Sequence, residues 1–518
     1  MKQTLQRLPI GIQNFESLRR DGYLYVDKTE KIYDLMDRGR YYFLSRPRRF
    51  GKSLLMSTIK AFYEGKKELF EGLAIAQKDV DWTAHPVFHL DFNANQYNDF
   101  DVLKEKLHDS LSKWEQEYDC KPNDLPSGMR FEKVIEQAYH KTGQRVVILV
   151  DEYDKPILQA IGNKKLQDEF REVLNGFYGA LKTMEGFIQF VLLTGVTKFG
   201  KVSVFSDLKN LKDISMDLHY HDICGITEQE LLSYFSYNID ELAEECDLTK
   251  EECIAKLGRI YDGYHFVENA QGVYNPWSIL NVFWSVKFGC YWFWTGTPSY
   301  LVELLQRHDY NLESMSHANV TADVLNSVDA ESKDPIPVIY QSGYLTIKGY
   351  KPEFKKYILG FPNQEVEEGF IQYLTPYYLS KTQDRTAFDV CKFSEDVETG
   401  KPEQFCKRLK SLFADTPYEL VKNLENHYQN IVWVVFKMLG FYTQAEYHTS
   451  EGRIDLVIAT SDYRYVMEFK LDGTAEEALQ QIKSKDYSLP FAMDDKKTFL
   501  IGMNFNSETR NIEKYIIE

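Results

Sequence analysis

Short apolar runs alternate with segments of helical periodicity between residues 40 and 200. The run that most constrains the fold is Arg145–Val150, in which five consecutive apolar residues are followed by Asp151 and Glu152. An apolar run without polar alternation predicts a strand buried on both faces, as in a parallel sheet covered by helices. The predicted strands are Tyr41–Leu44, Pro86–Phe92, Arg145–Val150 and Phe187–Thr194, and the predicted helices are Lys52–Tyr63, Phe100–Tyr118, Phe131–His140 and Gln167–Met184. We therefore expect an α/β fold with helices on both faces of a parallel sheet.

The chain is too long for one domain, because its 518 residues exceed the roughly 250–300 at which single cores stop growing. The pattern predicts a parallel-sheet core over 1–226, a mainly helical, aromatic-rich region over 227–310, a mixed connecting region over 311–420 and a second α/β unit over 421–518. In the last region we expect strands at Ile454–Thr460, Tyr465–Leu471 and Thr498–Met503, and a helix over 475–485.

Composition excludes some classes of function. The chain has 61 Lys and Arg against 78 Asp and Glu, and the net charge of −17 argues against a protein that coats nucleic acid non-specifically. The first 60 residues nevertheless hold 13 Lys and Arg against 6 Asp and Glu, so a local basic site stays open. The seven Cys include no Cys-x-x-Cys pair, which argues against a zinc site or a disulfide framework. Because no signal-peptide pattern and no run of 18 apolar residues is visible, we expect a soluble cytoplasmic protein without membrane contact.

The sequence Ser-Arg-Pro-Arg-Arg-Phe-Gly-Lys-Ser fills residues 45–53, between a predicted strand and a predicted helix. A loop that binds a nucleoside triphosphate needs backbone N–H groups around phosphate, a lysine for the β- and γ-phosphate oxygens and a hydroxyl for Mg²⁺. The second half of this pattern is present, whereas Arg46 stands where such loops usually have their first glycine. A basic turn that only caps a helix is the alternative. The residues expected to bind ATP are Arg48, Arg49, Phe50, Gly51, Lys52, Ser53 and Leu54, with Ser53 also on Mg²⁺.

Two acids at the end of the buried strand complete this pattern. We expect Asp151 to hold Mg²⁺ through water and Glu152 to orient and deprotonate the attacking water. A strand that ends in Asp-Glu is by itself commonly just solvated, but its occurrence after the loop favours an ATP-hydrolysing core. Thr194, at the end of the next strand, is the predicted sensor of the γ-phosphate, with Thr197 as the second choice. A plain strand-to-loop turn is equally compatible with these two threonines.

A second group of polar residues lies near the C-terminus. Glu468 and Lys470 are two apart on a predicted strand and so share one face, whereas Met467, Phe469 and Leu471 are expected to face the core. Pairing across the preceding turn would bring Asp455 close to Glu468. Two acids on a divalent cation, beside a lysine, suit metal-assisted phosphodiester hydrolysis. The following helix is expected to direct Gln481 toward the same centre; the alternative is an alternating strand with a solvated polar face.

These residues resemble a known family, the bacterial and archaeal AAA-ATPase-like proteins with a C-terminal PD-(D/E)XK nuclease-superfamily domain. The resemblance covers nearly the whole chain and includes Leu8–Gly11, Tyr25–Thr29, Arg46–Ser53, Val150–Pro156, Phe205–Leu211, Cys224–Thr227, Tyr274–Ser278, Gly452–Asp455, Glu468–Lys470 and Ala478–Ile482. Two departures from the wider superfamilies are Arg46 for the first glycine of the loop and Ile454 for the Pro of the nuclease motif.

The resemblance implies an AAA-like core over 1–226, a helical lid or winged-helix-like region over 227–310 and a PD-(D/E)XK domain over 421–518. It implies ATP and Mg²⁺ on Lys52, Ser53, Asp151 and Glu152, and a nuclease centre whose members are Asp455, Glu468, Lys470 and Gln481, with Asp455 and Glu468 on metal. The first hypothesis is an ATP-controlled, Mg²⁺-dependent enzyme that cuts DNA. The second is an ATP-dependent signalling switch whose nuclease-like domain is an inactive binding module. The sequence leaves open whether the chain forms a homo-oligomer.

Overall fold

The computed structural model describes residues 6–121, 124–198, 210–295, 305, 312–315, 318–325, 334–379, 392–414, 431, 434–435, 437, 444–445, 456–485, 487, 496–509 and 511–518. The chain divides into two compact units. The first comprises Met1–Tyr300 and Ser316–Val366, and the second comprises Leu301–Met315 and Glu367–Glu518.

The first unit is built on a parallel sheet with the strand order β2-β3-β4-β1-β5. The strands are β1 (Tyr41–Ser45), β2 (Val87–Asp91), β3 (Val146–Asp151), β4 (Ile188–Gly195) and β5 (Lys212–Asp213). Every residue of β1 and β3 is buried, as expected for strands covered on both faces. Because all pairs are parallel and β4 lies between β1 and β3, the carboxyl ends of these three strands meet at one edge of the sheet.

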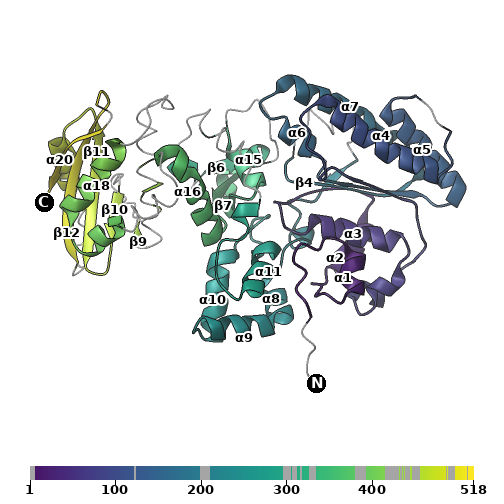
Figure 1. The fold of residues 1–518 in the computed structure, drawn as a ribbon, viewed down its shortest axis with the longest axis horizontal. Coiled ribbons are helices and arrows are strands. Elements are labelled where there is room, and N and C mark those ends of the chain that lie inside the picture. The colour runs from purple at the N-terminus through teal and green to yellow at the C-terminus, as the bar shows by residue number, and fades with distance from the viewer. Residues whose placement is uncertain are drawn as a thin grey trace. The chain divides into compact units, whose positions relative to one another are not determined.

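Helices cover both faces of this sheet, with α1–α3 on one face and α4, α5 and α7 on the other (Figure 1). Their bounds are α1 (Phe15–Arg20), α2 (Thr29–Arg38), α3 (Lys52–Tyr63), α4 (Phe100–Glu117), α5 (Ser127–Thr142), α6 (Lys155–Gln159) and α7 (Lys164–Thr183). The predicted α/β fold is therefore confirmed. The predicted element bounds differ from these by a few residues at the ends, where hydrogen bonding and capping, not hydrophobic pattern, decide the limits.

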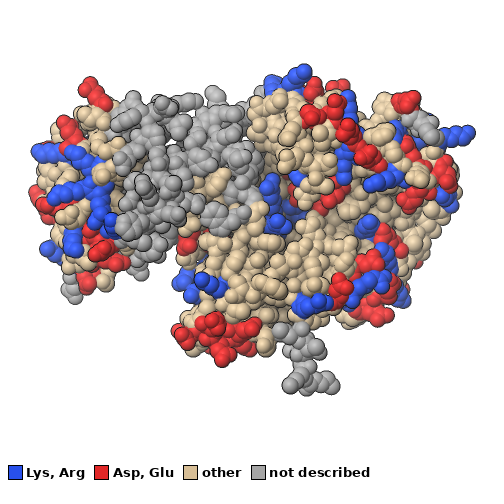
Figure 2. Space-filling view, viewed as in Figure 1, with Lys and Arg blue, Asp and Glu red and all other residues tan. Residues whose placement is uncertain are grey.

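A helical region follows the sheet, with α8 (Glu228–Tyr234), α9 (Ser236–Glu245), α10 (Lys250–Tyr261) and α11 (Pro276–Ser285). Capping boxes at Thr227 and Thr249 and the Asn275 cap begin three of these helices. One apolar core joins the helices to Leu24 of the N-terminal segment. Acidic side chains gather over α9 (Figure 2), whose exposed residues include Asp240, Glu241, Glu244 and Glu245.

A three-stranded sheet of order β6-β8-β7 completes the first unit. Its elements, with the neighbouring helices, are β6 (Asn319–Thr321), α14 (Ala322–Leu325), α15 (Ile336–Gln341), β7 (Thr346–Lys351) and β8 (Lys356–Gly360). Helix α16 (Gln364–Leu379) begins in the first unit and carries the chain into the second.

The second unit contains a five-stranded mixed sheet of order β13-β12-β11-β10-β9, in which only β11 and β12 are parallel. Its elements, with the short helix α13, are α13 (Leu312–Met315), α18 (Pro402–Ala414), β9 (Gln444–Ala445), β10 (Leu456–Ala459), β11 (Tyr463–Leu471), α20 (Ala475–Ser484), β12 (Lys497–Asn506) and β13 (Asn511–Ile517). Helix α20 packs on β11 and β12, and α18 packs on β13. Helix α18 thus precedes residue 421, where the sequence predicts the last domain to begin.

The predicted burial of Leu471 in β11 is wrong. Leu471 was expected in the core, but it is 37% exposed, because it is the last residue of the strand. Glu468, by contrast, is 2% exposed, because α20 covers its face of the sheet. Its burial does not fit the alternative of a solvated polar strand face. In the parts of the chain that the structure describes, no helix is long and apolar enough to cross a membrane.

The contact between α5 and α7 gives a test of the packing. A Cβ atom built on Gly128 would lie 2.2 Å from the Gly176 carbonyl oxygen, whereas one built on Gly179 meets nothing within 4 Å. Gly128→Ala should therefore force the two helices apart and lower the free energy of unfolding by about 1–3 kcal/mol. Gly179→Ala, the matched control, should leave it unchanged or raise it by up to about 1 kcal/mol. Thermal unfolding followed by circular dichroism measures both; equal midpoints would contradict the packing.

Candidate functional site

The loop between β1 and α3 has a backbone suited to binding an anion. Arg49 and Gly51 have positive φ angles of 67° and 92°, and Gly51 is the N-cap of α3. The first N–H groups of a helix have no partner within the helix and attract negative charge. Because the left-handed conformation at Arg49 costs a non-glycine residue about 1–2 kcal/mol, the loop holds local strain. Such strain is typical of ligand-binding turns.

Lys52 lies at the centre of this loop, with its side chain 3% exposed. Its Nζ donates hydrogen bonds to the carbonyl oxygens of Arg46 (3.1 Å) and Pro47 (3.2 Å). The same atom lies 3.3 Å from a carboxylate oxygen of Glu152. The ammonium group therefore connects the loop to the end of β3.

Asp151, the last residue of β3, lies beside two hydroxyl groups. Thr194 Oγ1 donates to Asp151 Oδ1 at 2.5 Å, and the hydroxyl of Ser53 also hydrogen-bonds this carboxylate. Burial, followed by the nearby charge of Glu152, raises the pKa of Asp151, and the two hydroxyl hydrogen bonds oppose this rise. Ser53 and Asp151 thus form a hydroxyl–carboxylate pair of the kind that holds Mg²⁺.

Glu152 follows β3 with a φ of 54°, a second positive value for a non-glycine residue at this edge of the sheet. The turn that results directs its carboxylate toward Lys52. Its side chain is 15% exposed, so the group is accessible to a small reactant. Lys52, Ser53, Asp151, Glu152 and Thr194, all predicted as site residues, are thus brought together.

The other predicted loop residues have different surroundings. Arg48 is half-buried, and its carbonyl oxygen accepts a hydrogen bond from the indole of Trp292. The guanidinium of the exposed Arg49 lies 4.5 Å from the ring centre of Trp277. Phe50 is buried, with its ring 4.7 Å from that of Tyr264. These contacts anchor the loop to the aromatic region, and the side chains of Arg49 and Phe50 pack against aromatic rings there.

Sequence reasoning missed the role of Arg46. This side chain is 1% exposed and donates to the carbonyl oxygens of Ser215 (2.8 Å) and Tyr220 (3.0 Å). Its guanidinium also lies 3.9 Å from the ring centre of Phe266. Arg46 therefore fixes the start of the loop to the segment after β5. The partners are distant in sequence, so no local pattern could have indicated them.

Asp154 is a second residue that the sequence analysis did not single out. It is fully buried, and its Oδ2 accepts hydrogen bonds from Val196 N (3.0 Å), Thr197 N (2.6 Å) and Thr197 Oγ1 (2.8 Å). Burial, followed by the charge of Glu152, raises the pKa of Asp154 to about 6. Thr197 therefore binds Asp154, just as Thr194 binds Asp151.

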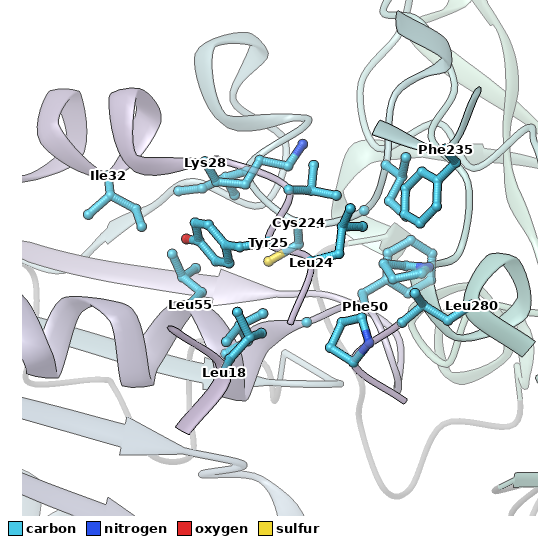
Figure 3. A pocket seen from close by; sticks show the side chains of 18 residues that line it. Leu18, Leu24, Tyr25, Lys28, Ile32, Phe50, Leu55, Cys224, Phe235 and Leu280 are labelled. Carbon is cyan, nitrogen blue, oxygen red and sulfur yellow. The ribbon is translucent and has the colours of Figure 1, made fainter. Parts of the chain in front are cut away.

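An apolar pocket lies next to the loop (Figure 3), with a volume of about 100 Å³. It lies between the N-terminal segment, the start of α3, residues 223–226, Phe235 and the first turns of α11. Its lining includes Leu24, Val26, Leu54, Cys224, Phe235 and Leu280, and it reaches Gly51. Leu54, predicted as a nucleotide contact, belongs to this pocket and not to the Lys52 centre.

In the second unit, Glu468, Lys470 and Gln481 form one hydrogen-bonded group. Lys470 Nζ donates to Glu468 Oε1 (3.0 Å) and to Gln481 Oε1 (2.6 Å), and Gln481 Nε2 also donates to Glu468. The lysine side chain is 31% exposed, so one side of the group is open to solvent. Asp455, the remaining predicted member, lies outside the described residues. Among the residues that are described, no three His, Cys, Asp or Glu side chains gather as a metal site.

The pKa of Asp154 gives a test of the first site. A carboxyl whose pKa is higher in the folded state than its ordinary 3.8 contributes stability at low pH that is lost as the pH rises through the folded pKa. Asn cannot titrate, and its oxygen can accept the same three hydrogen bonds. From about pH 4 to about pH 6, Asp154→Asn should therefore gain thermal stability relative to wild type. A constant difference across this range, measured beside the exposed control Asp109→Asn, would contradict the assignment.

Comparisons with known proteins match both halves of the chain. A family model described as "Predicted AAA-ATPase" matches residues 9–205, and a model of the PD-(D/E)XK nuclease superfamily matches residues 423–515. The chain is also 33% identical over 532 residues to the "Uncharacterized protein in vnfD 5'region" of Azotobacter chroococcum mcd 1, an alignment that covers 99% of each chain. The first match contains the Lys52 centre and the second contains the Glu468 group. The chain therefore belongs to the AAA-ATPase-like proteins that carry a C-terminal PD-(D/E)XK nuclease-superfamily domain.

Proposed function

We propose that this protein is a Mg²⁺-dependent ATPase whose C-terminal domain cleaves phosphodiester bonds of DNA under the control of ATP. The observation that carries the ATPase assignment is the meeting of Lys52, Ser53, Asp151, Glu152 and Thr194 where β1, β4 and β3 end. A lysine, a hydroxyl and two carboxylates beside a helix N-terminus are the groups that phosphoryl transfer to water requires.

Each residue of this centre has a role in the proposed reaction. Lys52 binds the β- and γ-phosphates, together with the N–H groups at the start of α3. Ser53 and Asp151 are the residues that would hold Mg²⁺, which when bound neutralises phosphate charge. Glu152 orients a water molecule and accepts its proton. Because Lys52 contacts Glu152 in the structure, phosphate must replace this contact, which frees the carboxylate for water.

The apolar pocket is the proposed site of the adenine base. Its lining is mainly apolar, with Lys28 as a charged member, and it reaches Gly51, so a base in it would be connected to phosphates at the loop. Burial of a flat aromatic ring against aliphatic side chains contributes affinity by the hydrophobic effect. Leu54 belongs to both the pocket and α3, which couples base binding to the helix that carries Lys52 and Ser53.

The ATPase proposal predicts different results for two substitutions. Lys52→Ala should abolish ATP binding, because it removes the cation at the centre of the loop. Glu152→Gln should retain binding but lower turnover by at least about a hundredfold, because an amide cannot accept the proton of water. Equilibrium ATP binding and steady-state phosphate release measure the two effects. Unchanged turnover in Glu152→Gln would refute its role, and binding without turnover in wild type would favour the ATP-dependent switch.

For the nuclease-like domain, the proposed centre contains Asp455, Glu468, Lys470 and Gln481. Glu468 would hold Mg²⁺ together with Asp455, and the metal when bound activates water and stabilises charge on phosphate. Lys470 donates hydrogen bonds to Glu468 and Gln481, which hold its ammonium group next to the Glu468 carboxylate. The ammonium group is therefore in place to position the nucleophile. We propose contact with DNA at this open side of the group. The acidic surface over α9 would repel phosphate and is not part of the proposed interface.

The nuclease proposal is tested with plasmid DNA and, in parallel, structured RNA. Wild type should cut DNA in Mg²⁺, and Glu468→Gln or Lys470→Ala should lower the rate by about a hundredfold or more. The controls are Glu508→Gln and Lys407→Ala, at exposed positions outside the group, which should cut like wild type. Cutting that survives both Glu468→Gln and Lys470→Ala would refute the catalytic assignment; cutting of RNA alone would refute DNA as the substrate.

A further inference from the structure

Glu365 is a buried carboxylate that the proposed reactions do not use. It is 1% exposed. Its Oε1 accepts hydrogen bonds from the backbone N–H groups of Tyr291 (2.5 Å) and Trp292 (2.8 Å), and its Oε2 accepts one from Ser278 Oγ (2.7 Å). A buried carboxylate is unfavourable unless its lone pairs are satisfied, and here three neutral donors satisfy them. These hydrogen bonds therefore fix the backbone of residues 291–292 to the first turn of α11.

Trp292 connects this carboxylate to the phosphate-binding loop. Its indole Nε1 donates to the carbonyl oxygen of Arg48 at 2.9 Å, and the side chain is 5% exposed. The ring packs against Tyr344 and Tyr264, at centroid distances of 5.4 Å and 6.3 Å. The indole therefore has little freedom to follow the loop unless residues 291–292 move as well. We name Arg48, Ser278, Tyr291, Trp292 and Glu365 the Glu365 cluster.

Glu365 lies close to the point at which the chain passes from the first unit to the second. Glu365 is the second residue of α16 (Gln364–Leu379), and the first compact unit ends at the next residue, Val366. The carboxylate that fixes Trp292 thus belongs to the turn of helix through which the chain passes from the first unit to the second. The Arg48 carbonyl group is therefore connected to this turn through Trp292 and Glu365 and their hydrogen bonds.

We propose that Glu365 is a positioning residue for the phosphate-binding loop, and that through Trp292 it links nucleotide binding at the loop to the start of α16. The inference rests on the proposed ATP binding at Lys52. Its physical basis is that the loop backbone is strained at Arg49, and the indole N–H group of Trp292 fixes the carbonyl group of the residue just before it, Arg48. Because linkage is reciprocal, a disturbance of α16 at Glu365 must also change affinity at the loop.

Two conservative substitutions separate this role from general core packing. Glu365→Gln keeps an oxygen that can accept both backbone N–H groups, and Ser278 can reverse its hydroxyl to accept from the amide. Trp292→Phe keeps an aromatic ring for Tyr264 and Tyr344 but has no N–H group for Arg48. Glu353→Ala, at an exposed position of the same unit, is the control for loss of a negative charge.

The experiment measures binding of a fluorescent ATP analogue to the full chain in Mg²⁺. Glu365→Ala and Trp292→Phe should each weaken binding by about three- to tenfold, the effect of one lost buried hydrogen bond. Both substitutions disturb the same contact between Trp292 and Arg48. The double variant should therefore bind the analogue no more weakly than whichever single variant binds it less tightly. Glu365→Gln and Glu353→Ala should bind within about twofold of wild type. If Glu365→Ala does not fold, Trp292→Phe and Glu365→Gln carry the same comparison.

Hydrogen exchange tests the link to α16 directly. At saturating nucleotide, amide exchange in residues 364–370 should slow in wild type and in Glu365→Gln but not in Trp292→Phe. Equal slowing in Trp292→Phe, or additive loss of affinity in the double variant, would overturn the inference while leaving the ATP site intact. A wild-type chain that does not bind the analogue would overturn the proposed ATP site and this inference with it.

Discussion

The contact between Lys52 and Glu152, at 3.3 Å, is the interaction on which the first unit depends. It exists because parallel strands place their carboxyl ends together, so that the loop after β1 faces the turn after β3. The positive φ angles of Arg49 and Glu152 turn the two backbone segments so that the side chains of Lys52 and Glu152 meet. Strain on both sides of this contact is held by many partners at once: Arg46 at the start of the loop, Trp292 at Arg48, and Asp154 after Glu152.

In the second unit, too, charged residues are held in place by contacts between a strand and a neighbouring helix. A strand residue, Glu468, is buried under α20, and the helix supplies Gln481 to bind both this acid and Lys470. The amide thus sets the position of the lysine relative to the carboxylate. In each unit a charged residue that would bind phosphate or metal is held in place by neutral hydrogen-bond donors and acceptors before any ligand arrives, which is the condition for electrostatic preorganisation.

The sequence was sufficient for the fold class and for residues whose role depends on local pattern. Gly51, Lys52 and Ser53 could be placed because a strand, a loop and a helix follow one another, and Asp151 because it ends an apolar run. Gln481 could be placed because its helix directly follows the strand that carries Glu468 and Lys470, which limits where its side chain can point. The exposure of Leu471 could not, because strand alternation gives the face on which a side chain lies but not whether the end of that face is covered.

Residues whose partners are distant in sequence were beyond prediction. Arg46 appears in the sequence only as a missing glycine, yet it binds carbonyl groups near residues 215–220. Glu365 lies in the mixed connecting region, just before a stretch of helical pattern, and its partners belong to residues 278–292.

The most direct test of the proposed ATP site is a crystal structure of the full chain with a non-hydrolysable ATP analogue and Mn²⁺. We expect phosphate oxygens on Lys52 in place of Glu152, the base in the pocket beside Leu54, and anomalous density for manganese next to Ser53 and Asp151. An analogue bound elsewhere, with Lys52 still in contact with Glu152, would contradict it.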